Sequence, residues 1–288
     1  MCGARTHHAF AANSLTSETT FCYWQCATCR VARLHADGVN ADLNRFYSTE
    51  YQPASKEFAY GGTTLLSRLR GANFRRIGRR LERLVPKGRV LDVGCGSGVF
   101  LDAMRRRGWV VAGLEPHKSS AYQLRTTRGL DVTDATLDQV SSEWGPFDAV
   151  SLLDVLEHLS DPRRALRKVW HLLRPGGVLV LATPNVDSLE HGFFGASWYA
   201  LQPPDHLWLF SARSLMNLLV SAGLGSAFFA VSPVSYAWPS LLRRLRLPPP
   251  PAPLDTAMKA IAAPPMFLAA GVTGAPAQLE VYARKLES

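Results

Sequence analysis

The sequence has no long apolar segment and no export signal. No uninterrupted apolar run approaches the roughly 20 residues that a membrane-spanning helix needs. The N-terminus shows no positively charged start followed by an apolar core, as a secretory signal would. We therefore expect a cytoplasmic protein. Hydrophobic residues still make up 47% of the 288 residues, which is enough to bury a sizeable core in one large domain with an appendage, or in two domains.

Acidic residues are fewer than basic residues. The chain has 23 Asp and Glu against 32 Lys and Arg, a formal net charge of +9. Two interpretations stay open: solvated helix faces, or attraction to an acidic partner such as RNA, an anionic membrane face or a phosphorylated substrate. No basic block is interleaved with aromatic residues, so we expect no DNA partner, and the sequence does not favour RNA.

Cysteine is scarce, and it is concentrated at one end. Four of the five cysteines lie in the first 50 residues, at Cys2, Cys22, Cys26 and Cys29. Without an export signal, such a cluster suggests a metal site before disulfides. Cys26 and Cys29 have the spacing of one zinc knuckle, which needs two more ligands, for example Cys22, His7 or His8. The alternative is a degenerate segment with free thiols.

A glycine-rich turn organises the rest of the chain. The stretch Arg89–Asp102 reads RVLDVGCGSGVFLD, which predicts a strand, a tight turn and the start of a helix. Such a turn leaves backbone open to a polar or anionic ligand, and Asp92 near the strand's end can accept hydrogen bonds. A dinucleotide fingerprint would have its third glycine at Val99, and no Gly-Lys-Ser/Thr is present to hold phosphates. The nicotinamide and nucleotide-triphosphate interpretations are therefore disfavoured.

This segment resembles the first motif of class I S-adenosylmethionine-dependent methyltransferases, and later motifs of that family follow in order over roughly 85–234 and the final strand. The resemblance implies a Rossmann-like, doubly wound α/β fold whose seven-stranded sheet has its last strand antiparallel. It implies S-adenosylmethionine as cofactor. Glu115, at the end of a predicted strand, is placed to accept bonds from both ribose hydroxyls. The loop 135–138 lies where the family contacts the adenine ring, and because Thr136 replaces the usual acidic residue there, we expect only the backbone to serve. The expected cofactor contacts are Asp92, Gly94, Cys95, Gly96, Ser97, Gly98, Glu115, Pro116, Thr136, Leu137, Leu153 and Asp154.

The segment Asp154–His158 is where we expect the chemistry. It most resembles the group that includes ubiquinone-pathway O-methyltransferases and small-RNA 3′-terminal 2′-O-methyltransferases, in which acid-x-x-Glu-His and a later histidine can hold a divalent ion. Three alternatives stay open here: His158 as general base without metal, with Glu157 beside it; a structural Glu-His pair; or a magnesium site. The last would use Asp154, Glu157, His158 and His206.

An aromatic loop follows the predicted fifth strand. Its aromatic side chains suit an apolar lid over a substrate, although part of the loop belongs to the core. We expect a small hydroxylated acceptor, such as a phenol, quinone precursor, sugar or secondary metabolite. An inactive scaffold and an RNA 2′-O-methyltransferase are the alternatives. The expected substrate contacts are Asn185, Trp198, Tyr199, His206 and Trp208.

The predicted order of parts is a cysteine-containing ribbon-like segment (1–50), capping helices (51–88), the cofactor-binding core (89–234), an insertion (235–276) and the final strand (277–288). Relatives often begin with a small zinc ribbon made of two cysteine pairs. We therefore interpret Cys2 as the second cysteine of the first pair, whose leading cysteine is missing. The insertion holds a proline-rich linker and an apolar helix, roughly 254–270, broken by Pro264 and Pro265. Its role is a lid, a dimer face or a membrane contact. The oligomeric state stays open.

Overall fold

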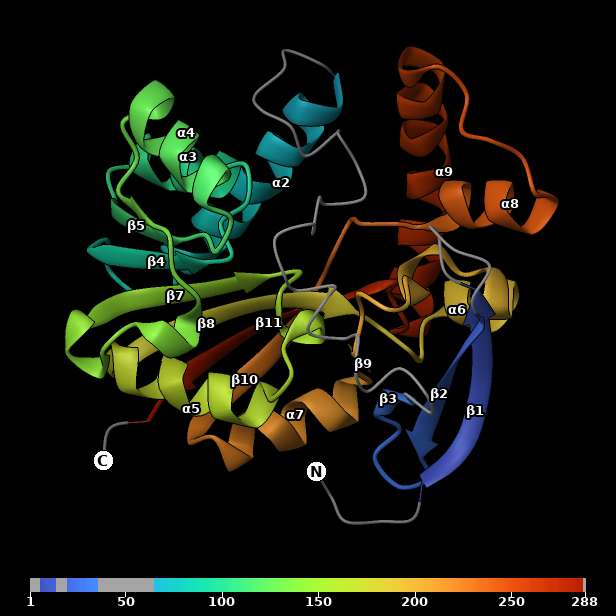
Figure 1. Ribbon diagram of the computed structural model, residues 1–288, viewed down its shortest axis with the longest axis horizontal. Coiled ribbons are helices and arrows are strands. Elements are labelled where there is room, and N and C mark those ends of the chain that lie inside the picture. The colour runs from blue at the N-terminus through green and yellow to red at the C-terminus, as the bar shows by residue number, and fades with distance from the viewer. Residues whose placement is uncertain (1–5, 14–19, 36–64, 287–288) are drawn as a thin grey trace.

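A sheet of seven strands forms the centre of the fold (Figure 1). The computed structural model describes residues 6–13, 20–35 and 65–286. The strands lie in the order β10-β11-β8-β7-β4-β5-β6, and β11 runs antiparallel to both of its neighbours. This confirms the predicted doubly wound sheet with an antiparallel last strand. Their bounds are β4 (Arg89–Val93), β5 (Val110–Leu114), β6 (Val132–Thr133), β7 (Phe147–Leu153), β8 (Leu173–Pro184), β10 (Leu224–Val231) and β11 (Gln278–Lys285).

Helices cover both faces of this sheet, which explains why its central strands are continuous apolar runs. One face is packed by α2 (Leu65–Leu81), α3 (Val99–Arg105) and α4 (Lys118–Arg128), and the other by α5 (Pro162–Leu172) and α7 (Ala212–Ser221) (Figure 1). Two hydrophobic clusters result, one on each side. Ile77 and Met104 belong to the first, and Leu166 and Leu215 to the second. All parallel strands therefore point their carboxyl ends to the same edge.

Local signals in the sequence set the helix boundaries. The Asp161 side chain accepts a hydrogen bond from the backbone N–H of Arg164, and Pro162 occupies the first turn of α5. Ser211 caps α7 in the same way, and α4 ends at Gly129 with φ 58°. The loops between these elements hold the short helix α6 (Leu189–Phe194) and the 3₁₀ turns η2 (Leu137–Gln139), η3 (Ser142–Trp144), η4 (Leu156–His158), η5 (Gly195–Ser197) and η6 (Tyr199–Leu201).

A second, antiparallel sheet joins the N-terminal segment to the core. It consists of β1 (Thr6–Asn13), β2 (Thr20–Cys26), β3 (Ala32–His35) and β9 (Trp208–Leu209), in that order. Its last strand comes from the aromatic loop, so the cysteine-containing segment is continuous with the core. The turn after β2 adds two contacts: the Ser211 hydroxyl donates to the Cys29 carbonyl, and Arg30 pairs with Asp187.

The insertion forms a helical hairpin of α8 (Ala237–Leu245) and α9 (Ala252–Thr273), which stands at one side of the sheet (Figure 1). The expected break at Pro264 and Pro265 is wrong, because α9 runs through both prolines. Each proline removes one helical hydrogen bond, but Pro264, Pro265 and the preceding Ile261 are all exposed, so water can bond the carbonyls that are left over. Among the described helices, none is long and apolar enough to cross a membrane.

Candidate functional site

The glycine-rich turn connects β4 to α3 with a bare stretch of backbone. Gly94, Gly96 and Gly98 have φ values of 67°, 51° and 70°, a left-handed conformation that favours glycine. A Cβ on Gly94 would lie 2.9 Å from a methyl group of Val155, and one on Gly98 would lie 2.8 Å from Leu124. Side chains are thus excluded on both conformational and steric grounds. The turn stays open beside the carboxyl ends of the strands.

Asp92 is buried under this turn. One of its carboxylate oxygens accepts a hydrogen bond of 2.6 Å from the Ser151 hydroxyl on the neighbouring strand β7. Burial raises the pKa of Asp92 to about 7, and the nearby charge of Glu115 adds to the rise. The same burial raises the pKa of the Cys95 thiol, which therefore stays protonated. The turn thus combines a carboxyl group that titrates near neutrality with an inert thiol.

Glu115 directly follows β5, and its side chain bonds to the glycine-rich turn. One carboxylate oxygen accepts from the Gly96 N–H at 2.9 Å and the other from the His117 N–H at 2.9 Å. Burial raises the pKa of Glu115, while these two bonds oppose the rise. A carboxylate has about four lone-pair positions, so both oxygens can still accept from a ligand. Pro116 follows and is exposed.

The loop expected at the adenine ring forms the 3₁₀ turn η2. The exposed Thr136 is its N-cap and shares a capping box with Gln139, so its side chain serves the loop itself. Leu137 is buried. At this position, backbone groups and the apolar side chain of Leu137 are therefore what a bound ligand can contact. Taken together, the glycine turn, Glu115 and this loop offer groups that fit S-adenosylmethionine: a carboxylate that can accept from a diol, and a buried carboxyl group, Asp92, that can accept from an amino group.

A second cluster lies at the ends of β7 and β8. Glu157, His158 and His206 each offer a ligand atom, and these atoms lie within 4.8 Å of one another. His158 bonds through Nδ1 to the Asp205 carbonyl at 2.9 Å, and His206 through Nδ1 to the Ala200 carbonyl at 2.7 Å. Because a carbonyl only accepts, each neutral ring carries its proton on Nδ1 and its lone pair on Nε2.

Burial controls the charges in this cluster. It lowers the pKa of His158, and it lowers the pKa of His206 well below the ordinary value, because the charge of a protonated His158 nearby adds to the effect of burial. Burial and the charge of Asp154 raise the pKa of Glu157. One Glu157 oxygen accepts from the Thr183 hydroxyl at 3.0 Å, and the other, Oε1, has no hydrogen-bond partner within the described residues. Two neutral imidazoles therefore surround a carboxyl oxygen that can still bind a proton or a cation.

Asp154 lies beside this cluster but is not part of it. It has φ 58° directly after β7, and its Oδ1 accepts 2.7 Å from the Gln278 amide of β11. Gln278 in turn accepts from the Ser232 hydroxyl at 2.7 Å. Burial raises the pKa of Tyr236, at the start of α8, and the charges of Asp154 and Glu157 add to the rise. Sequence reasoning missed Gln278 and Tyr236, whereas Thr183 is predicted to lie at this edge because it is a polar residue at the end of a buried strand.

The structure separates the expected substrate residues into two sets. His206 belongs to the cluster, whereas Trp198 and Trp208 are buried, in the part of the loop that belongs to the core. Trp198 packs against His191 and Tyr236, and Trp208 donates through its indole N–H to the Leu159 carbonyl. Burying an indole this large is favourable enough to draw the loop inward.

Asn185 and Tyr199 hold loops together. The Asn185 amide donates to the Pro276 carbonyl and accepts from the Asp187 N–H. Tyr199 is half-buried, and its backbone N–H donates to the Ser240 hydroxyl of α8. Both residues therefore connect the aromatic loop to the insertion.

The expected zinc ligands are only partly described. Cys26 and Cys29 are buried on either side of the turn between β2 and β3, and Cys2 lies outside the described residues. Within the described ranges, the cluster of Glu157, His158 and His206 is the one group of three potential metal ligands. A zinc site at the cysteines therefore stays a proposal.

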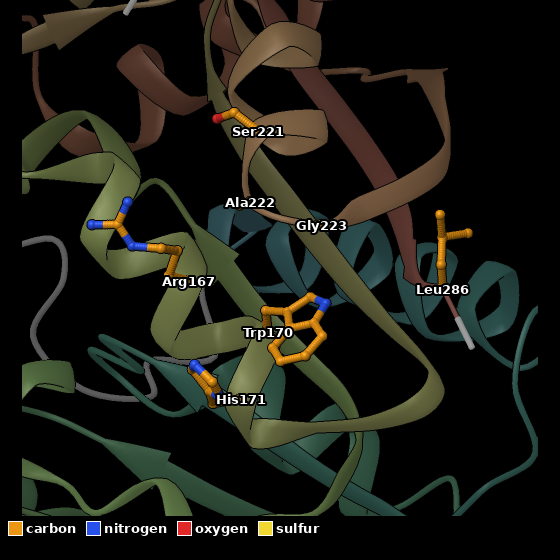
Figure 2. Close-up of a pocket in the computed structure, with 7 residues that line it drawn as sticks. All are labelled: Arg167, Trp170, His171, Ser221, Ala222, Gly223 and Leu286. Atoms are coloured by element: carbon orange, nitrogen blue, oxygen red, sulfur yellow. The ribbon is translucent and has the colours of Figure 1, made fainter. Parts of the chain in front are cut away.

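A hollow lies at the opposite end of the sheet (Figure 2). It is bounded by the end of α5, the turn before β10 and the residue after β11, which all lie at the amino ends of the parallel strands. It is therefore remote from the glycine turn. Its lining residues are Arg167, Trp170, His171, Ser221, Ala222, Gly223 and Leu286.

The sequence of this chain is similar to those of known proteins. The family described as "Methyltransferase domain" matches residues 65–225, more than half of the 288 residues. The chain is 37% identical over 102 residues to the ubiquinone biosynthesis O-methyltransferase of Pseudomonas paraeruginosa, which covers 33% of this chain and 44% of that protein. It is 30% identical over 167 residues to the protein of the same name from Cereibacter sphaeroides, covering 52% and 66%. The chain therefore matches less than two thirds of the length of these relatives.

A solved structure supports the same fold. A SAM-dependent methyltransferase from Archaeoglobus fulgidus has a TM-score of 0.52 to this chain at 16% identity, and the alignment covers 80% of this chain and 97% of that one. At this identity the likeness shows the fold alone. It agrees with the strand order and with the antiparallel last strand described above.

Proposed function

This chain belongs to the methyltransferase domain family, and from that membership we propose that it transfers the methyl group of S-adenosylmethionine to a hydroxyl oxygen of a small acceptor. The relatives named as O-methyltransferases support oxygen as the acceptor atom. The observation that carries the proposal is the position of two clusters at one sheet edge: the glycine turn with Asp92 and Glu115, and Glu157 with its two histidines.

The cofactor, when bound, supplies a methyl group on a positively charged sulfur, which is reactive toward an oxygen nucleophile. The bare turn from Gly94 to Gly98 would hold it, with Asp92 accepting from its amino group and Glu115 from its ribose hydroxyls. Leu153 and Asp154, at the end of β7, would also contact the cofactor. Holding two reactants in line in this way is worth several orders of magnitude in rate.

His158 is the proposed general base. Its pKa is lowered by burial, so the ring is neutral near neutral pH, and its lone pair is on Nε2. Nε2 would take the proton of the acceptor hydroxyl as the oxygen attacks. Glu157 lies beside the ring, and its position is fixed by Thr183 and by its backbone carbonyl, which accepts from the Leu207 N–H. It would stabilise the imidazolium that forms.

A divalent ion is the second way in which these residues could activate a hydroxyl. The ligand distances and the Glu157 oxygen without a partner in the described residues fit an ion. The donor set does not fit the expected magnesium: it holds two imidazole nitrogens, and Asp154 is bonded to Gln278 instead. Imidazole suits zinc, iron, copper or nickel better. Such an ion, when bound, would polarise the hydroxyl and lower its pKa.

The test is titration calorimetry with S-adenosylhomocysteine, followed by a screen of hydroxylated acceptors. We expect micromolar binding that is lost in Asp92→Ala and Glu115→Ala, and turnover that is lost in His158→Ala. No binding by the intact chain would overturn the proposal in favour of a scaffold role. Elemental analysis, and turnover after dialysis against a chelator, decide between base and metal: turnover that survives the chelator supports the base.

A further inference from the structure

The helical hairpin of α8 and α9 carries an exposed apolar row. In α9, Leu254, Ile261, Leu268 and Val272 are 54%, 65%, 69% and 89% exposed. Their spacing of seven, seven and four residues places them on one side of the helix. The charged residues of α9, Asp255 and Lys259, pair with each other at 2.7 Å. A stripe along the whole helix is therefore apolar, uncharged and open to solvent.

The end of α8 carries exposed leucines and arginines. Leu241, Leu245 and Leu247 are exposed, and the exposed Arg244 and Arg246 alternate with the last two. The Arg244 guanidinium lies 5.4 Å from the ring centre of Phe193 on α6, and this ring is 70% exposed. Leucine, phenylalanine and arginine thus share one surface. Arginine can keep its charged head at the headgroup level of a lipid layer while its stem packs on apolar groups.

The charge of the whole region favours an anionic partner. Between Asp205 and Glu280 the sequence contains a single acidic residue, Asp255. Its carboxylate is buried and accepts from the Trp238 indole N–H at 2.9 Å, while its other oxygen meets Lys259. No acidic side chain therefore faces outward among the described residues of the hairpin, and its exposed charges are positive.

The hairpin is also fixed to the core, so its surface is preformed. The Glu190 carboxylate accepts from the Ser235 hydroxyl at 2.5 Å and from the Tyr236 N–H at 2.8 Å, just before α8. The Trp238 bond to Asp255 then joins α8 to α9. Binding through a preformed surface loses little conformational entropy.

We propose that α8, α9 and Phe193 dock this protein on an anionic lipid surface, with the apolar row in the acyl boundary and Arg244 and Arg246 among the headgroups. A second copy of the chain fits less well, because a two-fold interface would bring the same arginines together. An acidic protein would match the arginines but not the uncharged stripe on α9. The proposal does not depend on the methyl transfer proposed above, since it concerns a surface outside the candidate site.

The experiment is flotation of the full chain with two kinds of vesicle, pure phosphatidylcholine and phosphatidylcholine with roughly a third phosphatidylglycerol, at low and high salt. We expect binding to the anionic vesicles alone, weakened by salt. Arg244→Gln and Arg246→Gln should each lower the affinity by about fivefold. Ile261→Glu with Leu268→Glu should abolish binding. The matched controls are Arg79→Gln on α2 and Val220→Glu on α7, both exposed positions, and they should bind as the wild type does.

Three outcomes would overturn the proposal. The intact chain could fail to float with either vesicle. The control variants could lose as much affinity as the hairpin variants, which would show adsorption through net charge alone. Light scattering could show a dimer that Ile261→Glu dissociates, without vesicle binding, which would make α9 an interface between copies. Circular dichroism and thermal unfolding of each variant show whether it is folded, so a folding defect cannot be mistaken for lost docking.

Discussion

The centres of the imidazole rings of His158 and His206 lie 4.7 Å apart, and the two ring planes make an angle of 75°. Both are fixed through Nδ1 to carbonyls of one loop, at Asp205 and Ala200. This loop therefore determines the direction of both Nε2 lone pairs, because an imidazole held at one nitrogen can only present the other. Each ring therefore keeps its Nε2 lone pair available to accept a hydrogen bond or to bind a ligand.

Replacing His158 should separate binding from chemistry. We expect His158→Ala to bind S-adenosylhomocysteine as the wild type does, because the glycine turn is untouched, and to lose about 10²- to 10⁴-fold in kcat. Calorimetry and a turnover assay measure the two effects. His171→Ala is the control, since His171 is exposed at the far end of the sheet and should change neither (Figure 2). Equal loss of affinity and turnover in His158→Ala would contradict the assigned role.

The pH dependence of turnover should follow the neutral form of His158. Burial lowers its pKa below the ordinary 6.5, so kcat should fall only on acidification below that value. The fall should disappear in His158→Gln and persist in Glu157→Gln. Because the unfolded chain binds the proton more readily, His158 also costs stability as the pH falls. A fall in kcat that begins above pH 6.5, the ordinary histidine pKa, would mean that another group is being titrated.

Asp92 should make the cofactor-free protein less stable as the pH rises. Its pKa is raised by burial from 3.8 to about 7, so between these values the folded state holds a proton that the unfolded state has lost. Stability contributed by protonated Asp92 is therefore lost as the pH rises through this window. Thermal unfolding at several pH values should show a smaller decline in Asp92→Asn. Asp131→Asn, at an exposed position, should decline as the wild type does.

Tyr23 should link the N-terminal sheet to the histidine loop. Its buried hydroxyl lies 2.7 Å from the Leu201 carbonyl and 2.8 Å from the His206 carbonyl. Tyr23→Phe leaves these carbonyls without that donor and should cost about 1–3 kcal/mol of unfolding free energy. Denaturant titration measures this loss, and kcat should fall because His206 shifts. Tyr122→Phe, at a position 62% exposed, is the matched control. An unchanged free energy would remove the link.

The sequence contained enough local information to predict the sheet and the glycine turn. Asp92 and Glu115 each follow an apolar run, and parallel strands bring such ends to one edge. The resemblance added His158 and His206, which the structure brings together.

Other features depend on contacts that no local pattern records. β9 has two residues, too few for any periodicity, yet it joins the N-terminal sheet to the core. Gln278 reaches Asp154 across 124 positions of sequence, and Tyr236 enters the site from the insertion. The sequence predicts that the loop with Trp198 and Trp208 is partly lid and partly core, because aromatic residues suit both. Only the packing of the whole loop distinguishes the two.

The pairing of β3 with β9 also affects the order in which the protein can fold during synthesis. Residues 20–35 leave the ribosome early, but the carbonyls that bond Tyr23 lie 178 and 183 positions later. The cysteine-bearing strands must wait for most of the core before their last partner arrives. We therefore expect the N-terminal sheet and the histidine loop to become ordered together, and only after residues 201–209 have been synthesised.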